Sequence, residues 1–279
     1  TAWGVQLARQ ANLTLVGRYQ GQGTSWVSAQ YRQCVYMSSA FPTTLVAKHP
    51  GVTVVDVSNP RHPHRTATLS SPAMVGGTWE SLKVNNKRGL LAAVGAGPLV
   101  SAGTFDVYSI KNNCAHPRLL NSFASTELTL PANGLGHEGG WAPDARTYYS
   151  AGILAGTLTA IDVTHPRHPH VIWTGTTNVL NHGFAISGNG DRLYLASLVP
   201  GGIDTFDISS IQHRRPHLFL REISAATWPL ADGFATQHAV PFIEHGTPYL
   251  LAVDEAGEGA LHLINISDPR HPVVTLQMQ

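Results

Sequence analysis

Gly51-Val-Thr-Val-Val-Asp-Val-Ser-Asn-Pro60, followed by Arg61-His-Pro63, is the stretch of sequence that decides the fold. A short β-branched run that ends in Ser, Asn and Pro predicts a β-strand followed by a tight turn. The carboxylate of Asp56 is expected to accept hydrogen bonds from backbone N–H groups of that turn, as in an Asx turn. Proline then ends the ladder, and a second strand is expected over residues 65–69.

This unit recurs along the chain, so internal repeats set the architecture. Close copies occupy residues 158–169 and 261–272, and each ends in Arg-His-Pro. Looser copies occupy residues 104–117 and 204–217. A hairpin pattern precedes the unit, most clearly in Phe184–Leu195, which alternates around a Gly-Asn-Gly turn. The positions aligned at the repeated aspartate are Asp56, Asp106, Asp162, Asp207 and Asn265.

Four antiparallel strands repeated at intervals of about fifty residues describe a β-propeller blade. The sequence therefore predicts an all-β fold, a single β-propeller domain over residues 1–279 built from four-stranded antiparallel blades. A β-sandwich and a β-helix are the competing all-β folds. An additional outer closing strand is expected over residues 12–19. A closed ring of five blades needs either this strand or the outer strand at residues 273–279, but not both. This leaves open whether the five repeats belong to a six- or seven-bladed ring. The expected blades are 24–70, 78–123, 136–175, 181–223 and 237–279.

The repeat resembles that of the LVIVD-repeat family of bacterial β-propeller proteins. The matching segments are Val54–Pro60, Ala160–Pro166, Thr205–Ser209 and Leu263–Pro269, and the resemblance spans nearly the whole chain. It implies the propeller fold and an exported protein, but no particular activity, because that family is largely uncharacterised. Asn265 stands where the family signature has Asp, which keeps the capping of the turn and removes the charge.

The composition excludes several classes of function. The chain has 18 basic and 17 acidic residues, a net charge of +1, and no run of Lys and Arg. It therefore lacks the basic surface of a nucleic-acid-binding protein and the polybasic cluster that binds anionic membranes. No apolar run reaches the ~18 residues of a transmembrane helix. The two cysteines, Cys34 and Cys114, allow either one disulfide or two buried free thiols.

Histidine is frequent, with 15 residues in the chain. Most of them fall in the repeated turn, where a structural role on the blade rim is expected: His62, His64, His116, His165, His168, His170, His213, His217 and His271. Three others, His137, His182 and His238, each lie twelve residues before an equivalent position of the second hairpin strand. Blade 2 has Trp79 at that position, followed by Glu80.

The three aligned histidines are expected at the start of innermost strands, whose ends converge on the propeller axis. Three imidazoles at one point form a candidate site for iron, copper or zinc. Glu138 is expected to orient a ligand or act as a base, and Glu80 is a candidate further ligand. Trp26, Trp79 and Trp141 are expected to wall a pocket there. The alternative is a polar, water-filled channel without an ion, because a one-residue slip in the alignment turns a side chain to the opposite face.

Three functions are compatible with these features. The first is an exported, metal-dependent oxidoreductase acting on a small molecule, with Glu138, His137, His182 and His238 as catalytic residues. The second is a non-catalytic scaffold that binds a protein partner at the propeller rim. The third is a cofactor-free isomerase or lyase in which Glu138 and the histidines transfer protons. The expected location is secreted, periplasmic or at the cell envelope, with no nucleic-acid partner.

Overall fold

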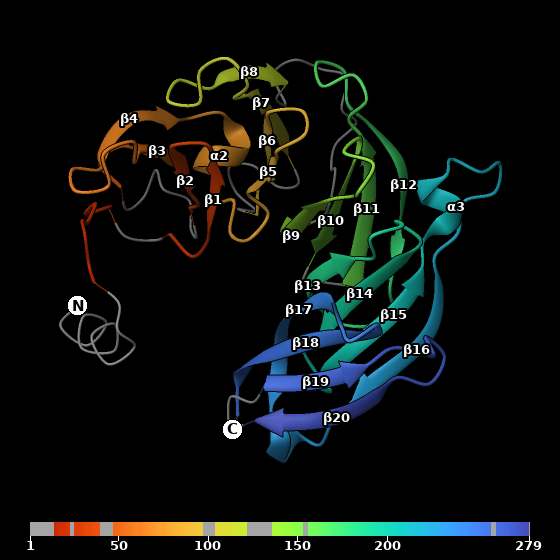
Figure 1. Ribbon diagram of the computed structural model, residues 1–279. Helices are drawn as coiled ribbons and strands as arrows, with labels where there is room; N and C mark the ends of the chain where they lie inside the picture. Colours follow the sequence, from red (N-terminus) through yellow and green to blue (C-terminus); the bar gives the residue numbers. More distant parts are fainter. Residues whose placement is uncertain are drawn as a thin grey trace.

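A computed structural model of the protein describes residues 14–22, 25–39, 47–96, 104–121, 136–152, 156–257 and 261–278. These residues form five four-stranded antiparallel sheets, and each sheet is built from four consecutive strands of the chain. The sheets follow one another along an arc, with the first and the last sheet in its two arms (Figure 1). The predicted all-β architecture of consecutive four-stranded blades is therefore confirmed.

The strands of each blade run in chain order from the innermost to the outermost position. Blade 1 contains β1 (Ser28–Tyr31), β2 (Cys34–Met37), β3 (Val52–Asp56) and β4 (His64–Leu69). Blade 2 contains β5 (Lys83–Asn85), β6 (Leu90–Val94), β7 (Phe105–Ser109) and β8 (Arg118–Asn121). Blade 3 contains β9 (Gly136–Trp141), β10 (Thr147–Gly152), β11 (Thr157–Asp162) and β12 (His170–Thr176). Blade 4 contains β13 (Asn181–Ile186), β14 (Arg192–Ser197), β15 (Gly202–Asp207) and β16 (Arg221–Thr227). Blade 5 contains β17 (Phe234–Glu244), β18 (Thr247–Ala256), β19 (Leu261–Asn265) and β20 (Val273–Met278).

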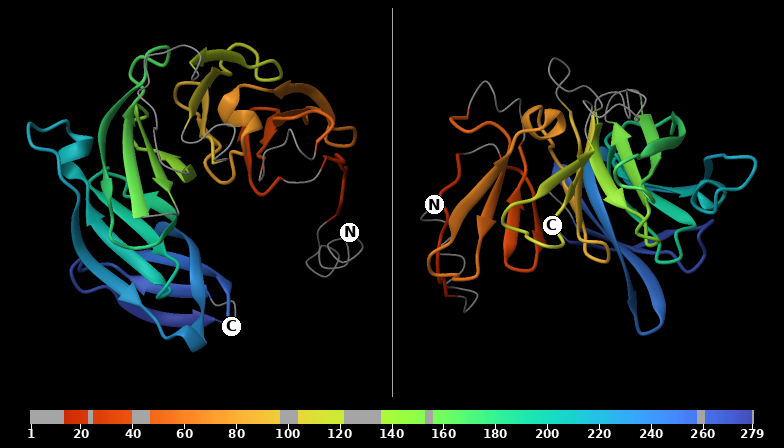
Figure 2. Two further views of the ribbon diagram at one scale, coloured as in Figure 1. Left: turned by 180° about the vertical axis from the view of Figure 1, so that it is seen from behind. Right: turned by 90° about the horizontal axis from the view of Figure 1, so that it is seen from above.

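Hydrophobic clusters join each blade to the next. The strands alternate in burial because successive side chains point to opposite faces, and the apolar residues of facing sheets interlock. The innermost strands β1, β5, β9, β13 and β17 consequently stand next to one another around the inside of the arc (Figure 2). Large members of the clusters, from the first interface to the last, are Tyr36 and Leu91, Phe105 and Tyr148, Tyr149 and Leu193, and Ile203 and Leu250.

The repeated Asp or Asn holds the turn after the third strand in four blades. One side-chain oxygen accepts a hydrogen bond from the backbone N–H two residues further on, at distances of 2.7, 2.7, 2.9 and 2.9 Å. These Asx turns were predicted from the sequence, and one acceptor oxygen is enough, so Asn can replace Asp. The four residues are Asp56, Asp162, Asp207 and Asn265.

Asp106 was wrongly aligned with these four residues. It is the second residue of β7 rather than the last, and it is completely buried. Its carboxylate accepts hydrogen bonds from the Ser71 hydroxyl and from the backbone N–H of Ala73 at the start of the short helix α2 (Pro72–Val75). Asp106 therefore fixes the entry to blade 2 from inside the protein, whereas the repeated residue closes a surface turn.

At three of the interfaces between blades, the turn that follows the third strand of one blade is hydrogen-bonded to the outer strand of the preceding blade. In each case a polar side chain of the outer strand donates a hydrogen bond to a carbonyl oxygen of the next blade's turn. The donor and acceptor residues are Thr66 and Ala115 (2.8 Å), Asn121 and Arg167 (3.2 Å), and Ser224 and Pro269 (2.7 Å). All nine histidines of these turns are exposed, which agrees with a place on the rim.

Residues 14–22 form no strand, which differs from the outer strand expected over residues 12–19. Residues 12 and 13 of that expected strand lie outside the described residues. Among the described residues, β4 is the outermost strand of blade 1. Val16 and Tyr19 instead line a groove on blade 1 together with Met37 and Pro60.

Cys34 and Cys114 form a disulfide, so the alternative of two free thiols is wrong. Cys34 begins β2 in blade 1, and Cys114 follows β7 in blade 2. Both residues are buried in the cluster between these blades. The crosslink therefore fastens the first blade to the second.

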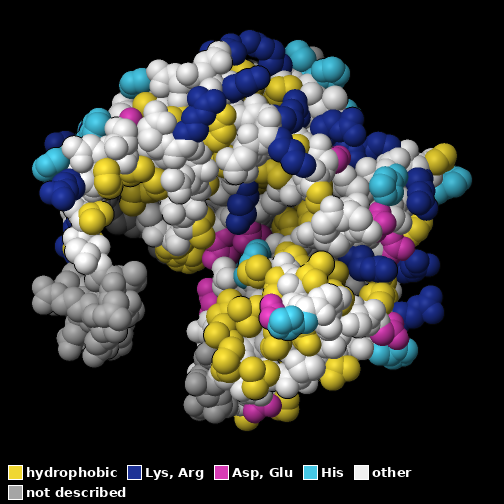
Figure 3. Space-filling model, viewed as in Figure 1, with side chains coloured by type: hydrophobic (Ala, Val, Ile, Leu, Met, Phe, Trp, Pro, Cys, Tyr) yellow, Lys and Arg dark blue, Asp and Glu magenta, His cyan; other side chains and the backbone are white. Residues whose placement is uncertain are grey.

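The outward face of blade 5 is rich in apolar side chains. Figure 3 shows hydrophobic side chains gathered over this blade. Val240, Val253, Leu276 and Met278 are all at least 36% exposed. The helical elements of the described chain are α2, α3 (Ser209–Gln212) and the 3-10 turn η4 (Leu230–Asp232). None of the described helices has the length and apolar character needed to cross a membrane.

Candidate metal centre

The candidate site lies where the innermost strands of blades 3 and 4 begin. His137 is the second residue of β9, and His182 is the second residue of β13. Glu80 comes shortly before β5, and its backbone pairs with that of Glu138 in an isolated parallel bridge. Figure 3 shows acidic side chains gathered in the hollow at the centre of the arc. The segments that carry these residues therefore meet near the axis, as the sequence predicted for the two histidines.

Glu80, His137 and His182 form one buried group. A ligand atom from each residue lies within 4.8 Å of the others. Glu80 Oε2 lies 3.7 Å from His137 Nδ1 and 3.9 Å from His182 Nε2, and each of the three side chains is at most 5% exposed. Two imidazoles and one carboxylate thus converge at a single point.

Neighbouring groups orient the converging atoms. Gln237 Nε2 donates a hydrogen bond to Glu80 Oε1 at 2.9 Å, which leaves Oε2 directed at the histidines. His182 Nδ1 lies 3.1 Å from the carbonyl oxygen of Thr236. A carbonyl only accepts, so Nδ1 carries the hydrogen and Nε2 keeps a free lone pair. Glu80 Oε2 and His137 Nδ1 have no hydrogen-bond partner among the described residues.

This donor set suits a divalent transition metal. Two histidines and one carboxylate are typical ligands of zinc hydrolases and of non-haem iron enzymes. Tetrahedral ligation at about 2.0–2.1 Å places donor atoms roughly 3.3 Å apart. The separations of 3.7 and 3.9 Å from Glu80 Oε2 are wider, and the three ligand atoms lie within 4.8 Å of one another, so side-chain rotations are needed to bring the atoms to ligating distance. An ion would also satisfy buried acceptors that otherwise cost about 1–3 kcal/mol each.

The protonation states fit the same conclusion. Burial, with a contribution from His182, lowers the pKa of His137 to about 3, so the imidazole is neutral near pH 7. Metal ligation requires a neutral imidazole. Burial also raises the pKa of Glu80, and repulsion from Glu138 adds to that effect. A cation at this point would offset both causes and hold Glu80 ionised.

Glu138 lies beside this group but pairs with other partners. Its carboxylate is 2% exposed, and Oε1 lies 2.7 Å from Lys83 Nζ. The backbone N–H of Gly139 donates a hydrogen bond to Oε1 at 3.0 Å, and Oε2 lies 3.9 Å from His238 Nδ1. Burial raises the pKa of Glu138, whereas the Lys83 ammonium lowers it. A buried carboxyl between an ammonium and an imidazole is suited to proton transfer.

His238 does not join the Glu80 group, although the sequence aligned it with the other two histidines. Both β9 and β17 carry a bulge near their start. In β9 the residue skipped by the ladder is His137. In β17 the skipped residue is Gln237, and His238 stays in the ladder opposite Val253. The bulge therefore comes one residue earlier in blade 5 than the alignment assumed.

This shift of the bulge exchanges the roles of two neighbouring side chains. Gln237 points to Glu80, and His238 points to Glu138. Burial lowers the pKa of His238 to about 4, and the nearby Lys83 ammonium acts in the same direction. His238 is thus a neutral imidazole next to a buried carboxyl, and Glu80 takes the place expected for the third histidine.

Two of the three predicted pocket tryptophans lie at the buried group. The ring of Trp79 lies 4.8 Å from that of His137, edge to face, and 5.2 Å from that of Trp26, which is half exposed. Trp79 has a backbone φ of +43°, which is rare for a bulky residue and marks a locally strained turn. Trp26 and Trp79 thus wall one side of the site.

Trp141 lies four residues beyond His137 on the same strand and lines a different cavity. Its indole N–H donates to the carbonyl oxygen of Lys83 at 3.2 Å. It lines a cavity of about 370 Å³ between the innermost strands of blades 1, 2 and 3, with Lys83 and Gln30 among its neighbours. This cavity brings solvent to the Lys83 side of the Glu138 pair.

Gly183 allows blades 4 and 5 to approach each other at the site. A Cβ atom at this position would lie 2.3 Å from the carbonyl oxygen of Gln237 and 2.7 Å from His238 Nδ1. Both distances are too short for any side chain, so glycine is required next to His182. Lys83, Thr236 and Gln237 were not predicted as site residues, since no motif in the sequence distinguishes them.

No protein-family model matches the chain, and no curated protein matches it either. Solved structures do. A proposed 6-phosphogluconolactonase from Bacteroides fragilis has a TM-score of 0.67 and 12% identity, and the match covers 95% of this chain and 71% of that one. The periplasmic gluconolactonase of Pseudomonas aeruginosa has a TM-score of 0.62 and 15% identity, with 88% and 66% covered. A proposed 6-phosphogluconolactonase from Bacteroides uniformis has a TM-score of 0.53 and 11% identity, with 88% and 82% covered.

These similarities establish the class of fold. Together with the five antiparallel sheets, they show that the chain is a β-propeller-like protein. At identities this low, similarity extends to the fold alone, and function has to be argued from the site.

Proposed function

We propose that the protein is a metal-dependent enzyme acting on a small molecule, with Glu80, His137 and His182 as the ligands of a divalent transition metal. The observation that carries the proposal is the convergence of three buried donor atoms, two of which lack any hydrogen-bond partner in the described chain. The first candidate reaction class is oxidation or reduction, since two histidines and one carboxylate are the ligands of non-haem iron enzymes; zinc hydrolases use the same donor set, so the ligands alone do not choose between the two classes. The bound ion would supply a redox centre and Lewis acid with open positions.

The residues around the ligands have separate tasks in this proposal. Glu138, held by Lys83 at 2.7 Å, gives or takes a proton at its carboxylate. Gln237 holds the Glu80 carboxylate in its orientation, and the Thr236 carbonyl sets the tautomer of His182. Such supporting contacts orient ligands and tune the metal. Trp79 keeps water away from one side of His137.

A second candidate is metal-dependent hydrolysis of a cyclic ester. It is favoured by Glu138, a buried carboxyl suited to activating water, and by the similarity to proteins described as gluconolactonase and 6-phosphogluconolactonase. The same three ligands would then hold a redox-inert ion such as zinc. The identity of the ion separates the two reaction classes.

Elemental analysis of the purified protein tests the proposal. We expect close to one equivalent of iron, copper or zinc, retained after washing, and loss of that metal in Glu80→Gln and His182→Ala. His238→Gln is the matched control and should retain the metal, because His238 lies beside Glu138 instead. Iron or copper with oxygen consumption supports the oxidoreductase, and zinc with hydrolysis of gluconolactone supports the hydrolase. Less than a tenth of an equivalent after reconstitution with each metal overturns the proposal and favours a scaffold or a cofactor-free isomerase or lyase.

Export and membership of the LVIVD-repeat family remain part of the proposal. The disulfide supports an oxidising compartment, because thiols in the cytosol are kept reduced. The similarity to a periplasmic protein agrees with a periplasmic or secreted location. Fractionation of cells that express the full-length protein, with and without a thiol-blocking reagent, tests the location and the disulfide together.

A further inference from the structure

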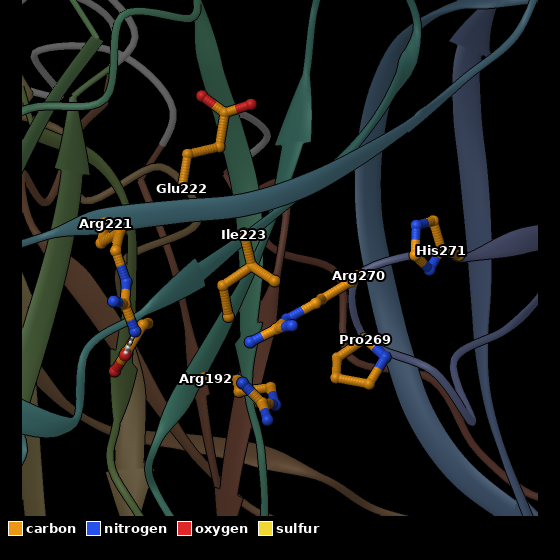
Figure 4. Close-up of a pocket in the computed structure, with 8 residues that line it drawn as sticks. Arg192, Arg221, Glu222, Ile223, Pro269, Arg270 and His271 are labelled. Carbon is orange, nitrogen blue, oxygen red and sulfur yellow. Dashed lines mark hydrogen bonds and ion pairs between the residues drawn. The ribbon is translucent and has the colours of Figure 1, made fainter.

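A second polar site lies on the rim of the propeller, between blades 4 and 5 (Figure 4). It is a groove of about 560 Å³. Its floor and walls come from Arg192 at the start of β14, Arg221 and Ile223 on β16, and the turn Pro269–His271 of blade 5. The groove and the candidate metal centre lie at opposite ends of blade 4, since Asn181 next to His182 pairs with Ser197 at the far end of β14.

Three guanidinium groups line the groove, and only one has a carboxylate partner. Arg221 Nη2 lies 2.6 Å from Asp207 Oδ2. The guanidinium groups of Arg192 and Arg270 form no hydrogen bond or ion pair with any described residue. In Figure 4 the side chain of Arg270 extends past Ile223 toward Arg192, while Glu222 points away from both arginines. Asp268 attracts Arg270 electrostatically without an ion-pair contact, so two guanidinium groups that lack a hydrogen-bonded carboxylate face the same space.

At the preceding interface, between blades 3 and 4, an arginine of one blade is paired with the repeated aspartate of the other blade. There Arg214 reaches back to Asp162 of blade 3, with Nη2 2.7 Å from Oδ2. In blade 4 the repeated aspartate is Asp207, and Arg221 of the same blade already occupies it. Asp207 is thus already paired, and Arg270 forms no ion pair with it.

We propose that this groove binds a small molecule through an oxyanion group, a phosphate or a carboxylate, held between Arg192 and Arg270. Guanidinium groups bind such oxygens in pairs, with charge-assisted hydrogen bonds. The anion would also relieve the repulsion between the two arginines, which is strongest where solvent is partly excluded. Ile223 offers an apolar contact for the rest of the molecule. This binding site is independent of the proposed metal chemistry.

Titration calorimetry of the full chain with pyrophosphate, citrate and acetate tests the inference, in low salt and with EDTA present so that no axial metal contributes. We expect saturable binding of pyrophosphate or citrate, and the stronger of the two tells whether phosphate or carboxylate is preferred. Arg270→Gln and Arg192→Gln should each weaken binding at least tenfold, and Arg270→Lys should weaken it less, because lysine keeps the charge but loses the paired donors.

The chain provides a matched control in Arg61, which occupies the same place in the turn of blade 1. Arg61→Gln removes the same charge and should leave the affinity unchanged. Equal weakening by Arg61→Gln and Arg270→Gln would mean a general charge effect and would overturn the inference. Absence of saturable binding in the folded native chain would overturn it as well. Glu80→Gln should bind the anions normally, so that failure of the metal proposal leaves this one standing.

Discussion

Reduction of the Cys34–Cys114 disulfide is expected to lower the free energy of unfolding by about 4.5 kcal/mol. The bond joins residues that are 80 positions apart. A crosslink that closes a loop of this length removes about 15 cal/mol/K of entropy from the unfolded chain, which corresponds to about 4.5 kcal/mol at 25 °C. Reduction leaves both sulfur atoms in the cluster between blades 1 and 2, so packing changes little and the crosslink dominates the effect.

Urea unfolding with and without a reducing agent measures this loss. The six tryptophans provide the fluorescence signal, and the shift of the midpoint multiplied by the slope gives the change in free energy. Titration of thiols in the denatured protein confirms the redox state of each sample. A double variant, Cys34→Ala with Cys114→Ala, should unfold at or below the midpoint of the reduced protein, because it also loses buried sulfur. Equal midpoints for oxidised and reduced protein, or two free thiols in protein purified without reductant, would refute the reasoning.

Three further predictions concern the site and the turns. Gly183→Ala should destabilise the protein by about 1–3 kcal/mol in thermal unfolding, since its Cβ meets a backbone oxygen at 2.3 Å; a neutral result would show that blades 4 and 5 are not this close. Asn265→Ala should cost about 1 kcal/mol through loss of the Asx turn, whereas Asn265→Asp should cost almost nothing in the same melt. Partial burial acts to raise the pKa of Asp162, but hydrogen bonds from Arg214 and Thr164 hold it below its ordinary value. This stabilisation is complete above the unfolded pKa of about 3.9 and is lost as the pH falls through the lower folded pKa. Arg214→Gln should therefore reduce stability more at pH 7 than near pH 2, where only the hydrogen bonds of Arg214 to the carbonyl oxygens of Ile211 and Gln212 remain to be lost, and a constant difference across that range would contradict the assignment.

The fold could be predicted because its determinants are local in the sequence. The run Val54–Pro60 contains a strand, an acceptor for the turn and a proline that ends the ladder, and the chain repeats this unit. The structure uses the acceptor in the expected way at Asp56, Asp162 and Asn265. Asp106 was misassigned because Phe-Asp-Val also fits the middle of a buried strand, and only the pairing of the hairpin in blade 2 distinguishes the two positions.

The candidate site could be predicted only in part. The twelve-residue spacing from the second hairpin strand predicted His137 and His182 correctly, because β9 and β13 both carry their irregularity at this same position and the spacing is equal in the two blades. The same counting misplaced His238, because a bulge adds one residue without leaving a mark in the sequence. The contact between Lys83 and Glu138 joins neighbouring blades, so no local pattern could reveal it.

The number of histidines is therefore a poor guide to the metal centre, and the positions of bulges are a better one. All nine turn histidines are exposed, whereas His137 and His182 are buried. In β9 the bulge turns His137 toward Glu80, and in β17 it turns Gln237 there and leaves His238 to face Glu138. If the bulge of β17 came one residue later, His238 would point to Glu80 and the centre would have three imidazoles. Whether a third imidazole joins Glu80, His137 and His182 thus depends on one backbone irregularity, while the residue types in the chain stay the same.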